Sequence, residues 1–199
     1  GAPKVEVLYN EVRLQGEEAA LVTVSLKYAD WETKPVTGFT IAGKSGELDC
    51  EVLAQRAVDD TYRVDILLTQ GTADAGSSYT IRGVTLGQGG TQEYISLDST
   101  DAGAREIKAD FWQKIGSIAD WQQYVISDTN ATNYLLTADL DFSQCTNGAD
   151  WYCNQNFYAT LNGGIYLERD VQLTSEAGEV LMQDGMPRTI RVWGDVVGM

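Results

Sequence analysis

Two aspartates in the second half of the chain have the residue type and spacing of a chemical site. Asp139 and Asp141 lie two residues apart within 133–142, NYLLTADLDF, where apolar and polar residues alternate. The alternation predicts a strand whose polar face carries both carboxylates about 7 Å apart. That separation suits an acid/base pair acting on a glycoside, or two ligands of a calcium ion. A solvent-exposed strand face gives the same pattern without any such role, and the sequence favours this plain interpretation.

The three cysteines offer a crosslink but no reactive centre. Cys145 and Cys153 are eight residues apart in SQCTNGADWYCN, and the turn signal at Asn147 and Gly148 can fold this segment back on itself. In an exported protein the spacing favours a disulfide, which would stabilise the fold by about 2–3 kcal/mol, with two free thiols as the alternative. Cys50 alternates with charged neighbours, so we expect a buried structural thiol and not a nucleophile.

Aromatic residues gather in and beside the same loop, together with amides. Flat apolar rings next to hydrogen-bonding amides are what a sugar-binding platform needs. The alternative, which the sequence favours, is that the rings plug the end of a β core. If this chain binds a carbohydrate directly, the predicted contacts are Trp151, Tyr152, Asn154, Phe157 and Tyr158.

Composition excludes several classes of function. The 199 residues contain no histidine, which removes Ser-His-Asp and Cys-His nucleophile systems and every His-ligated zinc site. Three cysteines are too few for an all-thiolate zinc site, so calcium is the metal that these side chains could still hold. The net charge of −15 repels phosphate backbones, so nucleic acid is a poor partner. No run of apolar residues approaches the roughly 20 that a transmembrane helix needs.

The elements that must position these residues are mainly strands. Residues 4–98 contain runs with period-2 alternation, clearest over 62–68, separated by punctuating segments such as GTADAGSS and GQGG. About seven strands at this spacing predict an antiparallel, Ig-like β-sandwich over residues 1–100. The fold class is therefore all-β. Because residues 101–109 lack alternation and carry Gly, Ala and mixed charges, we expect a linker there.

The period changes in the second domain, residues 110–199. Apolar residues at helical spacing predict one short helix over 118–127, begun either by Ser117 with Asp120 three residues later or by Asp120 with Gln123 three residues later. We expect its aromatic residues, Trp121 among them, to cover a β core and not to face a ligand. Beyond the helix the alternation of 133–142 opens a C-terminal β region.

The second domain resembles the opening of the β-helical, GLUG-type repeat region of bacterial cell-surface proteins. The resemblance is carried by Asp-Trp at 120–121, by the extended segment NYLLTADLD at 133–141, by the turn FYATLNGG at 157–164 and by TIRVWGDVVG at 189–198. An N-terminal sandwich before such a region is also familiar from lipoproteins of gut anaerobes. Because solenoids need several stacked repeats, we expect either a longer natural chain, with this region a truncated β-helix, or a small sheet of its own.

The resemblance implies an exported protein, anchored at the cell surface or outer membrane or held in the periplasm. The chain begins Gly-Ala-Pro, which indicates a processed or recombinant start, so the lack of a leader does not argue against export. We expect a non-enzymatic protein of adhesion or carbohydrate-binding type, whose partner is a glycan or a protein of a host or other cell surface. The alternatives are a structural spacer in a longer surface protein, and a part of a polysaccharide-degrading β-helix enzyme.

Overall fold

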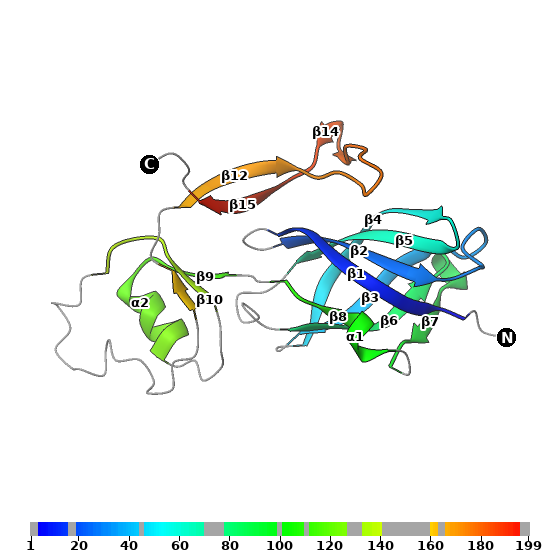
Figure 1. The fold of residues 1–199 in the computed structure, drawn as a ribbon, viewed down its shortest axis with the longest axis horizontal. Coiled ribbons are helices and arrows are strands. Elements are labelled where there is room, and N and C mark those ends of the chain that lie inside the picture. Colours follow the sequence, from blue (N-terminus) through cyan, green and yellow to red (C-terminus); the bar gives the residue numbers. More distant parts are fainter. Residues whose placement is uncertain are drawn as a thin grey trace.

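The computed structural model describes residues 4–15, 19–43, 46–69, 78–98, 101–109, 112–126, 133–140, 160–162 and 166–195. In these residues the fold is mostly β, as predicted. Seven strands form one antiparallel, nearly closed, barrel-like sheet, which fills one side of Figure 1. Smaller sheets and a short helix make up the rest. No helix in the described part is long and apolar enough to cross a membrane.

The large sheet has the strand order β1-β2-β5-β4-β3-β6-β7, with every neighbouring pair antiparallel. Two layers are joined because β4 is shared between them. Its residues 46–48 pair with β3 and its residues 49–58 pair with β5, with a register shift between Val52 and Ala54. A bulge of this kind bends a strand, so β4 can run from one layer into the other. The strands are β1 (Glu6–Gln15), β2 (Ala19–Lys27), β3 (Val36–Gly43), β4 (Gly46–Val58), β5 (Thr61–Thr69), β6 (Tyr79–Leu86) and β7 (Glu93–Ser96).

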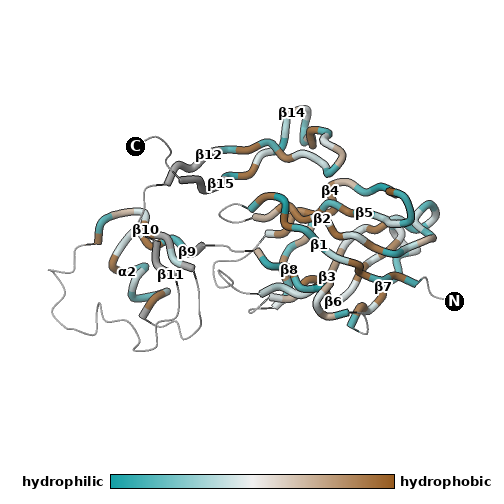
Figure 2. Tube along the Cα trace, viewed as in Figure 1, coloured by the Kyte–Doolittle hydropathy of each residue, from teal (hydrophilic) through white to brown (hydrophobic). Residues whose placement is uncertain are grey.

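Alternation in the sequence places one face of each strand in a single core. Figure 2 shows apolar and polar residues interleaved along these strands. On β5, for example, Tyr62, Val64, Ile66 and Leu68 are all buried in this core. Every period-2 run found in residues 4–98 coincides with a strand of the sheet. Strand β3 was not predicted, because register shifts after Val36 and after Thr40 interrupt its alternation.

Two side-chain amides close the seams where strands part. Gln55 on β4 accepts a hydrogen bond from the backbone nitrogen of Val36 and donates one to its carbonyl oxygen, both at 2.9 Å, as a neighbouring strand would. At the opposite seam, Asn10 on β1 donates to the carbonyl oxygens of Ala104 at 3.0 Å and Glu106 at 2.7 Å. The amides satisfy backbone groups that would otherwise lie unpaired at these seams.

The segment 101–109, predicted as a linker, contains α1 (Ala102–Arg105) and β8 (Glu106–Ile107). Strand β8 pairs with β6, beyond the four residues of β7, so it continues the last position of the large sheet. Ile107 is fully buried in the core of that sheet. The buried guanidinium of Arg105 donates to the carbonyl oxygen of Ile81 at 3.0 Å. These contacts join the segment to the first 100 residues.

A three-stranded parallel sheet, β11-β10-β9, follows in the chain. It consists of β9 (Trp112–Ile115), β10 (Asn133–Leu136) and β11 (Thr160–Asn162). The predicted helix is present as α2 (Ile118–Asp120) and the π-helical turn η3 (Trp121–Ile126). Of the two helix starts that the sequence allows, the structure has the one at Ser117, whose Oγ accepts from the backbone nitrogen of Asp120 at 3.1 Å. Trp121 is buried with Ile115, Val125 and Tyr134, so it covers this small sheet.

A long hairpin ends the described chain and lies along the large sheet, beside β4 and β5 in Figure 1. Its stem pairs β12 (Tyr166–Gln172) with β15 (Thr189–Asp195), and its tip pairs β13 (Met182–Gln183) with β14 (Met186–Pro187). At the tip Asp184 and Gly185 both have positive φ, 51° and 78°, as a two-residue type I′ turn requires. Leu173 and Ile190 of the hairpin pack on Leu21 of β2 in a second apolar cluster.

Candidate functional site

Most of the side chains predicted to do chemistry lie outside the residues that the structure describes. These are Asp141, both cysteines of the predicted disulfide, Cys145 and Cys153, and all of the predicted sugar contacts, Trp151, Tyr152, Asn154, Phe157 and Tyr158. Each of these assignments stays a prediction. Two candidates, Asp139 and Cys50, can be placed.

Asp139 is exposed and follows the end of β10 at Leu136, so it does not lie on a strand. The hydrogen bonds between β10 and β9 end with the amide of Thr137, which donates to the carbonyl oxygen of Ile115 at 3.0 Å. The predicted spacing of two carboxylates along one strand face therefore does not apply to Asp139. Among the described residues, no three His, Cys, Asp or Glu side chains gather closely enough to hold a metal ion.

Cys50 lies on β4, partly buried against the core of the large sheet, and is a free thiol. Burial raises the pKa of the Cys50 thiol from 9.0 to about 11, although a backbone hydrogen bond from Phe39 lowers it in part. A thiol is nucleophilic and binds metals only as the thiolate. Near neutral pH Cys50 is thus protonated and acts as a core side chain.

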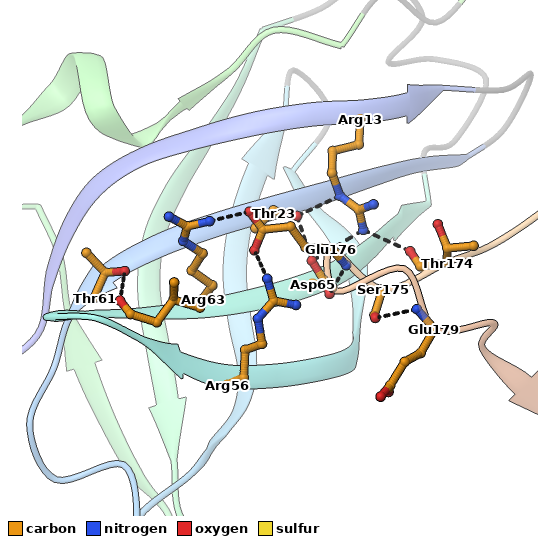
Figure 3. Close-up of polar contacts among 11 residues, drawn as sticks. Arg13, Thr23, Arg56, Thr61, Arg63, Asp65, Thr174, Ser175, Glu176 and Glu179 are labelled. Carbon is orange, nitrogen blue, oxygen red and sulfur yellow. Dashed lines mark hydrogen bonds and ion pairs between the residues drawn. The ribbon is translucent and has the colours of Figure 1, made fainter.

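Partly buried charged side chains gather around the buried Asp65 on the outer face of β1, β2, β5 and β4, beneath the C-terminal hairpin (Figure 3). We call this group the Glu176 cluster; it consists of Arg13, Thr23, Arg56, Arg63, Asp65 and Glu176. Asp65 on β5 is only 4% exposed. Its Oδ1 accepts from the hydroxyl of Thr23 at 2.6 Å and from Nη2 of Arg13 at 3.3 Å. Its Oδ2 accepts from the backbone nitrogen of Glu176 at 3.0 Å.

Glu176 carries the other half of the cluster. Arg56 and Arg63 stand directly opposite each other on β4 and β5, a cross-strand pair of like charges that would repel. The carboxylate of Glu176 bridges them, with Oε1 at 2.6 Å from Nη1 of Arg63 and Oε2 at 2.9 Å from Nη2 of Arg56. This hydrogen bond to Glu176 raises the pKa of the Arg63 guanidinium above its ordinary value. The carboxylate of Glu176 thus offsets the repulsion between the two arginines and also attaches the hairpin to the sheet.

A tight turn holds Glu176 in this position. The backbone nitrogen of Ser175 donates to the carbonyl oxygen of Glu179, and that of Gly178 donates to the carbonyl oxygen of Ser175, both at 2.8 Å. The Ser175 hydroxyl accepts from the nitrogen of Glu179 at 3.2 Å. Next to the turn, Arg13 of β1 donates to the carbonyl oxygen of Thr174 at 2.9 Å. These hydrogen bonds within the turn and to Arg13 fix the position of the loop on the sheet.

The chemistry of the Glu176 cluster is that of an internal attachment. Each of its two carboxylates is occupied on both oxygens by donors from the same chain. A general acid or base needs a free position from which to exchange a proton with a substrate. In addition, the loop itself covers the cluster. The contacts between the loop and the sheet join residues that are 111 to 161 positions apart in the sequence, which makes the cluster a long-range structural tie.

The sequence holds one signal that was missed for this cluster. Asp65 stands inside the segment with the clearest alternation in the chain, residues 62–68, which becomes the interior strand β5. A carboxylate is rarely buried unless it is paired, so an acid at that position calls for a cationic partner. The identity of the partner, Arg13, and of the covering loop has no local signal.

A comparison of this chain with protein-family models, with curated proteins and with solved structures finds no match.

Proposed function

We propose that this chain is a non-enzymatic, exported cell-surface protein of adhesion or carbohydrate-binding type. The observation that carries the proposal is the Glu176 cluster. There both carboxylates, of Asp65 and Glu176, accept hydrogen bonds on each oxygen from other parts of the same chain, so they hold the loop to the sheet and are not open to a substrate. Such an arrangement suits a rigid module that presents a binding surface and does not catalyse a reaction.

The strand order supports an Ig-like sandwich as the first domain. Strands β1-β2-β5-β4 correspond to A-B-E-D of the immunoglobulin order, and β3-β6-β7 correspond to C-F-G. The shared strand β4 accounts for the continuous, barrel-like sheet. Domains with this order are common in extracellular and cell-surface proteins, although a fold by itself does not specify a function.

The small parallel sheet supports the resemblance of the second domain to the start of a β-helix. Strands β9, β10 and β11 stack in chain order, in parallel, each adding to the previous one. This is how successive turns of a parallel solenoid are built. The helical segment α2–η3 packs on both β9 and β10, with Trp121 and Val125 in one apolar cluster with Ile115 and Tyr134.

A glycan array probed with the intact chain tests the proposal, beside an assay for reducing ends released from the same polysaccharides. Binding without release of reducing ends is the expected result. Release of reducing ends would show the polysaccharide-degrading alternative to be right. A Trp151→Ala variant tests whether the predicted aromatic loop contributes to binding. Trp121, which is buried in the apolar cluster of the small sheet, is unchanged in this variant.

A structural spacer is the second candidate, and a specific observation favours it. The hairpin is tied to the sheet at three places along its length, by the apolar cluster of Leu173 and Ile190, by Glu176, and by the ion pair of Arg188 with Glu51. A spacer module needs to be rigid, so that it holds its neighbouring domains at a fixed separation. No binding across the array, and no adherence of beads coated with the protein to cells, would favour this role.

A further inference from the structure

The large sheet has a second feature of interest where its edge strand β1 faces the α1–β8 segment. A groove of about 430 Å3 lies along this seam, and we call it the β1–α1 groove. Its lining includes Tyr9 and Asn10 from β1, and Gly103, Glu106 and Lys108 from the other side. Small-molecule sites in proteins range from roughly 300 to 1,000 Å3, so the groove is large enough to hold one small ring-shaped ligand.

The groove has a fixed floor. Asn10 spans the seam by donating to the carbonyl oxygens of Ala104 and Glu106, which sets the distance between the two walls. Behind the far wall, the buried Ile107 and Arg105 join α1 and β8 to the large sheet. A ligand would therefore enter a preformed site and would not have to order it, which reduces the entropic cost of binding.

Two charged groups on the walls have no internal partner. In the described part of the chain, the carboxylate of Glu106 and the ammonium of Lys108 have no hydrogen bond or ion pair with another residue, and Tyr9 interacts only electrostatically, with Arg63. This contrasts with the Glu176 cluster, where every carboxylate oxygen has a donor. Tyr9 is also 45% exposed, so its ring presents a flat apolar surface beside these groups. Hydrogen-bonding capacity, an aromatic face and a cavity thus coincide.

We propose that the β1–α1 groove binds a neutral saccharide. A sugar ring has an apolar face that can lie on Tyr9, and hydroxyls that both donate and accept. The carboxylate of Glu106 accepts from such hydroxyls, and the ammonium of Lys108 donates to them. These two side chains cancel each other's charge, while the whole chain carries −15, so the groove favours an uncharged sugar over a sulfated or sialylated one.

This inference rests on the proposed carbohydrate-binding function and assigns it a location away from the predicted aromatic loop of residues 151–158. The test is a titration of the isotope-labelled intact chain with the methyl glycosides of glucose, galactose and N-acetylglucosamine, followed by NMR. The expected result is that backbone signals of residues 9–12 and 103–108 shift with one of these glycosides.

Three variants and two matched controls sharpen the test. Tyr9→Ala removes the aromatic face and Glu106→Ala removes the acceptor carboxylate, and each is expected to weaken binding about tenfold or more. Gly103→Phe fills the groove without removing any polar group; a side chain is tolerated there, because an added Cβ would meet only Asp101 at an ordinary 3.6 Å. The controls are Tyr94→Ala, which removes another exposed tyrosine, and Glu47→Ala, which removes another exposed glutamate; both lie outside the groove lining.

The outcomes separate this proposal from the general function. Loss of binding in the three groove variants, with the controls unchanged and all variants folded by circular dichroism, supports the site. Binding retained within about twofold in Tyr9→Ala and Gly103→Phe overturns the groove while leaving carbohydrate binding intact. If neither the array nor the three glycosides bind the unmodified chain, the carbohydrate-binding function is wrong and the groove site with it. Tighter binding of a sulfated or sialylated sugar would overturn the choice of a neutral ligand.

Discussion

Replacing Glu176 with Gln should destabilise the protein far more than the same change at Glu51. Both glutamates tie the C-terminal hairpin and the large sheet together through arginines, so the two substitutions are chemically matched. They differ in burial, because the Glu176 side chain is 18% exposed and that of Glu51 is 56% exposed. Glu176 also bridges two arginines of opposite strands, whereas Glu51 pairs with Arg188 alone.

The magnitude follows from the contacts. Glu176 makes two charge-assisted hydrogen bonds, at 2.6 and 2.9 Å, and a hydrogen bond to a charged group contributes about 1.5–3 kcal/mol. A glutamine keeps one acceptor oxygen but loses the charge, and it leaves Arg56 facing Arg63. Because these side chains are partly exposed, water recovers some of the loss. We therefore expect Glu176→Gln to cost about 2 kcal/mol, and Glu51→Gln about 0.5 kcal/mol, as for an exposed ion pair.

Urea unfolding followed by tryptophan fluorescence measures both costs, and hydrogen exchange of residues 173–181 locates them. Equal costs for the two variants, or a cost below about 0.5 kcal/mol for Glu176→Gln, would refute the reasoning. A double variant adds a second check. Arg56→Met in the Glu176→Gln background removes the repulsion, so the two changes together should cost less than their sum.

Three further predictions concern titration and the seam of the sheet. Because the pKa of Cys50 is about 11 when folded and 9.0 ordinarily, its contribution to stability is full below pH 9 and is lost as pH rises towards 11. Alkylation by iodoacetamide at pH 8 should accordingly be slow in the folded chain and fast in urea; equal rates would contradict its burial. The hydrogen bond from Arg188 lowers the pKa of Glu51, so the stability lost in Glu51→Gln should be present above pH 4.5 and vanish at lower pH. Urea midpoints measured from pH 7 down to 3 check this, and a constant gap between the variant and the original protein would count against it. Asn10→Ala leaves two carbonyl oxygens unpaired, so it should cost about 1–3 kcal/mol and speed hydrogen exchange in β8; unchanged exchange there would show that the amide does not hold the seam.

Local patterns explain why much of the fold could be predicted. Where a strand is regular and has one buried face, as β5 does, the period of two appears directly in the sequence. The helix start at Ser117 was also visible, because a capping side chain and its partner are only three residues apart. Strand β3 does not show this period of two in the sequence, because register shifts at two positions move its side chains between faces.

Long-range pairings account for what could not be predicted. Nothing in the neighbourhood of Asp65 specifies that a loop 111 residues later will donate to it. The β1–α1 groove depends likewise on Asn10 meeting residues 94 and 96 positions away. Because residues 101–109 lack alternation, the sequence predicts a linker there. In the structure, tertiary contacts of Ile107 and Arg105 bring this segment into the sheet. Sites of this kind become visible only when the strand order is known.

The bridge that Glu176 makes has a consequence for the order in which the protein folds. All strands of the large sheet lie before residue 108, and a ribosome adds roughly 5–20 residues per second. For several seconds the sheet can therefore exist with Arg56 facing Arg63 and with Asp65 uncovered. The loop that neutralises them arrives late, and its contacts span more than 100 residues. We expect contacts that close this late to be absent from the folding transition state, so that weakening them accelerates unfolding and leaves the folding rate nearly unchanged.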